Sequence, residues 1–123
     1  MMRVLHYVNQ FFGRVGGEEV AGIGPSLVDR PLGPGLLLER LLGAQGKVIG
    51  TVLCGDNYFA ERGEAAALEI LELLSPLKFD VLVAGPAFNA GRYGLACGLL
   101  CKSLQEKLAA LFTSPPSYRA TFG

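Results

Sequence analysis

Polar side chains that could do chemistry gather in three short stretches of this 123-residue sequence, each directly after an apolar run. The stretches are residues 9–19, 54–59 and 85–97. The candidate site residues in them are Cys54, Glu18, Glu19, Asp56, Asn57, Tyr58, Asn89, Arg92 and Tyr93. An arginine or the free N–H groups of a turn can hold a carboxylate, and an acid can hold an amine. This set of side chains therefore fits a small zwitterion.

The acids and amides among these candidates also have purely structural interpretations. Asp56 and Asn57 suit a turn in which the side chains bond their own backbone. Glu18 and Glu19 suit a solvated loop or the first turn of a helix. Both interpretations stay open from the sequence alone.

The three cysteines are Cys54, Cys97 and Cys101. We expect free thiols, because the number is odd and the chain lacks export features. Cys54, at a strand end beside a glycine, is the candidate catalytic residue, since a following helix N-terminus would favour its thiolate. Cys97 and Cys101 are four residues apart and are read as small buried hydrophobes. No His/Cys spacing supports a metal site, so none is predicted.

Composition excludes several classes of protein. Half of the residues are hydrophobic and 18% are charged, which is typical of one globular domain. Eleven basic and eleven acidic side chains cancel, giving no electrostatic reason to expect nucleic acid or a membrane surface as partner. No apolar run reaches the length of a membrane span or of a signal-peptide core, so we expect a cytoplasmic protein.

The elements that must position the candidates alternate between strand and helix. A short run that is apolar on both faces, Val81–Ala84, suits the middle of a parallel sheet covered by helices on both sides. The other predicted strands are Arg3–Val8 and Lys47–Leu53, and the predicted helices are Leu36–Leu42, Glu61–Leu74 and a third ending near Leu108. This β-α-β-α-β-α order predicts a Rossmann/flavodoxin-like parallel α/β sheet. Its three strand-end turns would meet at one edge.

Two segments do not fit a complete domain. Residues 20–35 carry seven glycines and prolines, which indicates an ordered surface loop. Residues 109–123 contain Pro115 and Pro116 and no apolar run, so no further strand is predicted there. We expect a three-stranded, incomplete domain over residues 1–108, with an edge poorly covered, and an atypical tail over 109–123.

Five blocks of the sequence resemble a known protein family. They are residues 6–13 (HYVNQFFG), 16–19 (GGEE), 33–35 (GPG), 54–59 (CGDNYF) and 84–98 (AGPAFNAGRYGLACG). In this order and spacing the blocks are similar to the N-terminal part of the component B selenoprotein of glycine, sarcosine and betaine reductases, a family related to D-proline reductase. The resemblance covers about residues 3–108.

This resemblance implies a role in a reductive deamination of anaerobic amino-acid metabolism, leading towards acetyl phosphate. It implies a pyruvoyl group on a partner subunit, a selenocysteine downstream in component B, a second selenoprotein (selenoprotein A) and an acetyl-phosphate-forming component as partners. The electron-withdrawing group and the ionised selenium would together displace the substrate nitrogen. The substrate could be glycine, sarcosine, betaine or proline, and no residue distinguishes them.

The sequence also departs from this family. It contains no selenocysteine, so we expect the chain alone to be inactive and no cofactor to be held in it. The resemblance stops at about Ala109, which a frameshift, a gene-call error or a split or decayed gene would explain. Two alternatives follow: a non-catalytic small-ligand-binding or interaction module, and an inactive truncated product.

Overall fold

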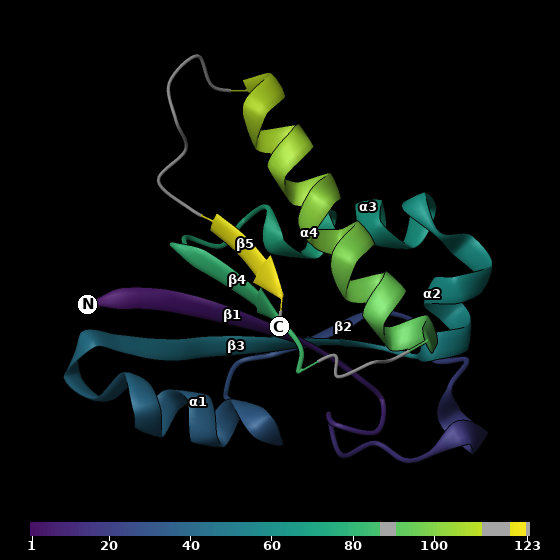
Figure 1. Ribbon diagram of the computed structural model, residues 1–123, viewed down its shortest axis with the longest axis horizontal. Helices are drawn as coiled ribbons and strands as arrows, with labels where there is room; N and C mark the ends of the chain where they lie inside the picture. The colour runs from purple at the N-terminus through teal and green to yellow at the C-terminus, as the bar shows by residue number, and fades with distance from the viewer. Residues whose placement is uncertain (87–90, 112–118, 123) are drawn as a thin grey trace.

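The computed structural model describes residues 1–86, 91–111 and 119–122, with side chains over 1–86 and 91–107. Strands and helices alternate along the chain (Figure 1). The strands are β1 (Met2–Asn9), β2 (Ser26–Val28), β3 (Gly46–Cys54), β4 (Val81–Ala84) and β5 (Arg119–Phe122). The α-helices are α1 (Pro34–Leu42), α2 (Asp56–Arg62), α3 (Glu64–Leu74) and α4 (Gly91–Leu111). Two 3-10 turns are η1 (Glu18–Val20) and η2 (Gly43–Gln45).

The strands form one sheet of order β2-β3-β1-β4-β5, in which β2 alone runs antiparallel. Without β2, the order matches the flavodoxin-like arrangement, with the chain reversing its direction across the sheet between β1 and β4. The predicted α/β class with a parallel sheet is therefore confirmed. The carboxyl ends of β1, β3 and β4 lie at the same edge, as expected.

Helices cover the two faces unequally. On one face, α3 and α4 pack on the hydrophobic core, which includes Leu5, Tyr7, Val52, Ile70, Leu82 and Leu100. On the other face, α1 packs against β3, and a Cβ added at Gly35 would lie 2.9 Å from Nδ1 of His6. Figure 1 shows α1 alone on its side, next to β3. Among the described residues, that second layer thus contains one α-helix.

Helix boundaries follow the breakers in the sequence. Pro34 occupies the first turn of α1, where its missing N–H costs nothing, and Gly43 ends the helix at φ 55°. Gly63, at φ 51°, separates α2 from α3. The prediction of one helix over Glu61–Leu74 is wrong in this respect. The predicted polar turn at 54–59 is also shorter, because α2 already begins at Asp56.

Two strands were not predicted. Residues 26–28, within the glycine- and proline-rich segment, pair antiparallel with β3 through Leu27 and Val52. Residues 119–122, within the tail, pair parallel with β4. The expected three-stranded sheet is therefore wrong, since β2 and β5 occupy the two edges.

Candidate functional site

The candidate site lies at the carboxyl edge of the sheet, where β1, β3 and β4 end side by side. Ligands in open α/β sheets bind in the crevice at this edge, where the strand order reverses. Here the loop after β1 and the start of α4 flank that reversal. The residues that meet there come from three distant parts of the chain.

The loop after β1 is fastened to the turn after β3 by backbone hydrogen bonds. The amides of Asn57 and Tyr58 donate to the Ala21 carbonyl at 2.9 and 3.1 Å, and the Gly55 amide donates to the Ile23 carbonyl at 2.9 Å. A side chain at position 55 has no room, because its Cβ would lie 2.1 Å from the Ala21 carbonyl oxygen. Gly55 therefore permits the close approach that holds the two segments together.

Asp56 is the buried acid of the site, with 7% of its surface exposed. Its Oδ2 accepts a hydrogen bond from Nδ2 of Asn9 at 3.1 Å, and its backbone amide donates to Oε1 of Gln10 at 3.0 Å. Its Oδ1 is buried without a hydrogen-bond partner in the described part of the chain. Burial raises the Asp56 pKa, although the Asn9 hydrogen bond and the charge of Arg92 oppose this shift. The described residues thus leave one buried acceptor of Asp56 unsatisfied.

Arg92, in the first turn of α4, joins two of the other candidates. Its guanidinium donates to Oδ1 of Asn57 and forms an ion pair with Oε1 of Glu18. The side chains of Arg92 and Glu18 are 39% and 71% exposed, so water and ligands can reach this pair. Glu18, Asn57, Arg92 and Asp56 therefore form a charged cluster at the carboxyl edge, which we call the edge cluster.

The remaining candidates do not join the edge cluster. Glu19 accepts a hydrogen bond from the Gly17 amide at 2.9 Å and is exposed, and this bond lowers its pKa. The Tyr58 hydroxyl donates to the Glu69 carboxylate at 2.7 Å. Tyr93 is buried, and its hydroxyl donates to the Tyr7 carbonyl at 3.4 Å. Asn89 lies outside the described residues.

Cys54 is wholly buried at the end of β3. Its thiol lies 3.7 Å from the Gly55 carbonyl and 4.0 Å from the Ile23 carbonyl. Burial, followed by the nearby carboxylates of Glu69 and Asp56, raises its pKa to about 12. A thiol in this state is protonated at neutral pH, so these facts lend no support to a catalytic role for Cys54.

Two amides of the site were missed as individual candidates. Asn9 and Gln10 hold Asp56 from the end of β1, and both are buried. The signal in the sequence is a pair of polar residues directly after a wholly buried strand segment. Such residues need partners at the strand end, because an unpaired buried amide is costly.

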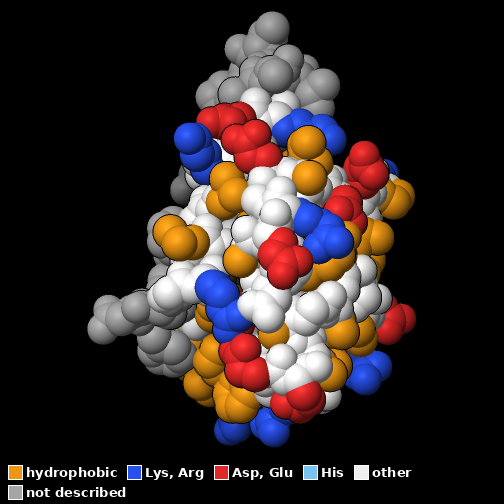
Figure 2. All heavy atoms as spheres, turned by 90° about the vertical axis from the view of Figure 1, so that its right-hand side faces the viewer, with side chains coloured by type: hydrophobic (Ala, Val, Ile, Leu, Met, Phe, Trp, Pro, Cys, Tyr) orange, Lys and Arg blue, Asp and Glu red, His pale blue; other side chains and the backbone are white. Residues whose placement is uncertain are grey.

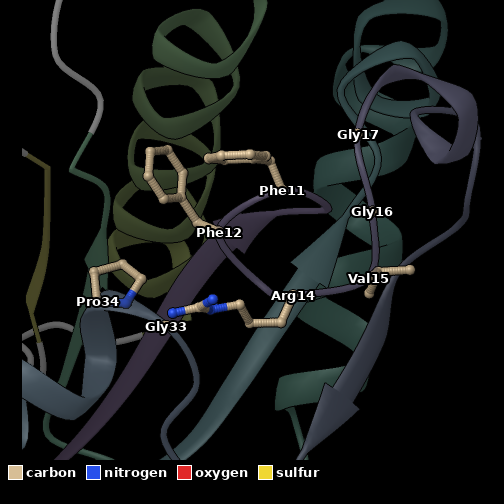
Figure 3. Close-up of a pocket in the computed structure, with 8 residues that line it drawn as sticks. All are labelled: Phe11, Phe12, Arg14, Val15, Gly16, Gly17, Gly33 and Pro34. Atoms are coloured by element: carbon tan, nitrogen blue, oxygen red, sulfur yellow. The ribbon is translucent and has the colours of Figure 1, made fainter.

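A cavity of about 590 Å³ opens between the loop after β1 and the start of α1 (Figure 3). Figure 3 shows the rings of Phe11 and Phe12 together on one side and the Arg14 side chain reaching toward Gly33 and Pro34. Arg14 has a φ of 67° and forms no ion pair with the described residues. The lining residues are Phe11, Phe12, Arg14, Val15, Gly16, Gly17, Gly33 and Pro34.

Charge is otherwise evenly spread over the surface in view. Figure 2 shows acidic and basic side chains interleaved across one face of the molecule, with hydrophobic side chains between them. Within the described residues, no three His, Cys, Asp or Glu side chains group as metal ligands. No described helix is both long enough and apolar enough to cross a membrane.

Comparisons with known proteins agree on one family. The family profile described as "Glycine/sarcosine/betaine reductase selenoprotein B (GRDB)" matches residues 1–115. The match extends beyond residue 108, at which the resemblance was expected to end. No solved structure matches the chain.

Curated relatives carry the names of three reductases. The chain is 49% identical over 107 residues to the glycine reductase complex component B subunit gamma of Symbiobacterium thermophilum, covering 87% of this chain and 25% of that protein. It is 49% identical over 107 residues to the sarcosine reductase complex component B subunit beta of Peptoclostridium acidaminophilum, and 43% identical over 108 residues to the betaine reductase complex component B subunit beta of the same organism. These two matches cover 87% of this chain and 24% of each relative. The chain thus spans about a quarter of the length of the curated relatives it matches.

Proposed function

The chain belongs to the glycine/sarcosine/betaine reductase selenoprotein B family, and on that premise we propose that its edge cluster forms part of the amino-acid binding site of a reductase component B. The printed names of the relatives specify glycine, sarcosine and betaine. All three carry a carboxylate and a positively charged nitrogen. A site for them needs an anionic and a cationic group a few ångströms apart.

The observation that carries this proposal is the buried, unpaired Oδ1 of Asp56. A buried acceptor without a partner costs about 1–3 kcal/mol, and a ligand N–H placed there recovers that free energy. The ammonium group of glycine supplies both the N–H and the positive charge. Asp56 is therefore the proposed amine-binding residue.

Arg92 is the proposed carboxylate-binding residue. Its guanidinium has five N–H donors. In the structure Nη1 donates to Asn57 and Nη2 donates to Glu18. A substrate carboxylate can use the free donors or displace the exposed Glu18 side chain. Glu18 then remains close enough to hold the arginine in place when no substrate is bound.

The family resemblance assigns the bond-breaking chemistry to groups outside these 123 residues. A pyruvoyl group on a partner subunit and a selenocysteine elsewhere in component B would supply the electron withdrawal and the nucleophile. The thiols of the chain do not fit the second role, because burial raises the pKa of Cys54 and Cys97 to about 12 and that of Cys101 to about 11. In this proposal the chain binds and orients the substrate, within a cytoplasmic complex that also contains selenoprotein A and the acetyl-phosphate-forming component.

Non-catalytic ligand binding by this chain is a second candidate function. The three buried free thiols are compatible with it, since it requires no nucleophile in the chain. It differs from the first proposal only in whether the bound molecule is later reduced. Formation of acetyl phosphate by the assembled complex would support the first proposal, and binding without its formation would support the second.

The direct test is titration calorimetry of glycine, sarcosine and betaine into the purified chain. Asp56→Asn should weaken glycine binding about tenfold or more, because a charged hydrogen bond is lost. Betaine, which has no N–H, should lose less. Asp29→Asn changes the same residue type at an exposed position outside the edge cluster and should leave binding unchanged. Equal affinities of the wild type and Asp56→Asn for glycine would sink the assignment.

A further inference from the structure

Strand β4 is apolar on both faces, but among the described residues helices fully cover only the face toward α3 and α4. Leu82 and Ala84, which face the α3–α4 layer, are completely buried. Val81 and Val83, which face the α1 layer, are only partly buried. Sheets of parallel strands are normally covered by helices on both faces, and a run such as Val-Leu-Val-Ala suits that environment. The sequence of β4 thus indicates a cover that the described part of the chain does not supply.

The uncovered region is a groove between α1 and β4. It holds a cavity of about 220 Å³ lined by His6, Pro34, Leu38, Val83, Ala84, Gly85 and Pro86. None of these side chains carries a permanent charge. We call this region the α1–β4 groove.

Leucines of α1 extend the apolar surface beside the groove. Leu37 and Leu41 are 58% and 76% exposed. Leu41 adjoins Leu37, four residues before it, and Leu38, three residues before it, and Leu38 lines the groove. Large exposed leucines in a row next to an apolar cavity are characteristic of a surface that another polypeptide covers.

A buried polar atom of His6, one of the residues that line the groove, lacks a hydrogen-bond partner among the described residues. His6 is 2% exposed, and its Nε2 donates to the Gly85 carbonyl at 2.5 Å. Since a carbonyl can only accept, Nε2 carries the proton and Nδ1 is an acceptor. Nδ1 is buried without a hydrogen-bond partner among the described residues. It lies against Gly35 of α1, since a Cβ added there would be 2.9 Å from this nitrogen.

We propose that the α1–β4 groove binds an amphipathic helix from the part of the component B polypeptide that this chain does not span. The relatives are about four times as long as the matched segment, so in them a large polypeptide of the same subunit lies outside it. A helix beside α1 would complete the second layer over β1 and β4. The proposal rests on family membership and on the uncovered face, and is independent of the proposed substrate site.

The test uses the tagged chain co-expressed with the part of the Symbiobacterium thermophilum relative that lies outside the matched segment. We expect the two polypeptides to co-purify. The Leu37→Asp, Leu41→Asp double variant should weaken their association about tenfold or more, as loss of buried anchor residues does. Both leucines are exposed in the chain alone, so its circular dichroism spectrum should stay unchanged.

Leu68→Asp is the matched control, because Leu68 is 53% exposed on α3, in the other helix layer. Its affinity for the co-expressed polypeptide should equal that of the wild type. The proposal is overturned if the wild-type chain does not co-purify, if the double variant binds as well as the wild type, or if Leu68→Asp weakens binding equally. A homodimer of the chain that the double variant dissolves would assign the groove to a second copy instead. Glycine binding by the chain alone reports on the substrate site separately.

Discussion

Replacing Gly55 by alanine should loosen the edge cluster without touching any of its side chains. The new Cβ would lie 2.1 Å from the Ala21 carbonyl oxygen and 2.9 Å from the Ile23 amide nitrogen. Real contacts to a Cβ are essentially never under 3.0 Å, so the 21–23 segment must withdraw by about 1 Å. The Ala21 carbonyl would then leave hydrogen-bonding distance of the Asn57 and Tyr58 amides.

The cost follows from these lost contacts. Two backbone hydrogen bonds contribute about 1 kcal/mol each. Forcing an extra carbon into a packed site adds about 1–3 kcal/mol. Gly55→Ala should therefore lower the free energy of unfolding by about 3–5 kcal/mol. For a domain of this size that corresponds to a fall in Tm of roughly 12–20 °C.

Urea unfolding followed by circular dichroism measures this change, and Gly22→Ala is the control. Gly22 lies in the same segment, but a Cβ there would meet no atom within 4 Å. Its substitution should change the stability by no more than about 1 kcal/mol. Equal urea midpoints for Gly55→Ala and the wild type would refute the close approach. An equal loss in both variants would attribute the effect to loop flexibility.

Three further predictions concern ionisable groups. Burial raises the Asp56 pKa, so ionising this carboxyl at a pH above its ordinary pKa of 3.8 destabilises the folded state. As the pH rises from about 4 to 7, the free energy of unfolding in urea should therefore fall less for Asp56→Asn than for the wild type. Parallel pH profiles of the two proteins would contradict this. The Arg3 guanidinium lowers the Asp80 pKa, so the pair stabilises the fold above the ordinary pKa of 3.8 and this contribution disappears as the pH falls through the folded-state value. Asp80→Asn should thus be less stable than the wild type at neutral pH, and the difference should shrink as the pH falls below 3.8; a difference that stays constant in acid would argue against the pair. Burial raises the Cys54 pKa to about 12, so native protein should react with iodoacetamide at least about 100-fold more slowly than protein in urea; fast native labelling of Cys54 would restore it as a candidate nucleophile.

Much of the fold was predictable because breakers flank the regular elements. Val81–Ala84 matches β4 residue for residue, and Pro34 and Gly43 mark the two ends of α1. The break at Gly63 was not predicted, since a glycine within an apolar helical pattern is often tolerated. The short strands β2 and β5 have weak local patterns and form by pairing with β3 and β4, which are distant in sequence.

The site was predictable in its location and less so in its contacts. Parallel strands place their carboxyl ends at one edge, and this brings Glu18 to Arg92 across 74 residues of sequence. The pairing of Tyr58 with Glu69 depends on side-chain directions on neighbouring helices, which no local pattern encodes. The same is true of the turn of Glu19 back onto Gly17. The place of the site thus follows from the strand topology, whereas the hydrogen-bond partners of its side chains depend on their rotamers.

The contact at Gly55 sets the surroundings of the two ionisable groups at the end of β3, the Cys54 thiol and the Asp56 carboxylate. By letting residues 21–23 pack against the turn, it places the Ile23 carbonyl over the Cys54 thiol and shields that thiol from solvent. The same turn starts α2 at Asp56, whose amide and carboxylate then meet Gln10 and Asn9 at the end of β1. One oxygen of that carboxylate is left unpaired. The thiol at the strand end is therefore part of the packed core, and the acid two residues later is the side chain with an unsatisfied acceptor.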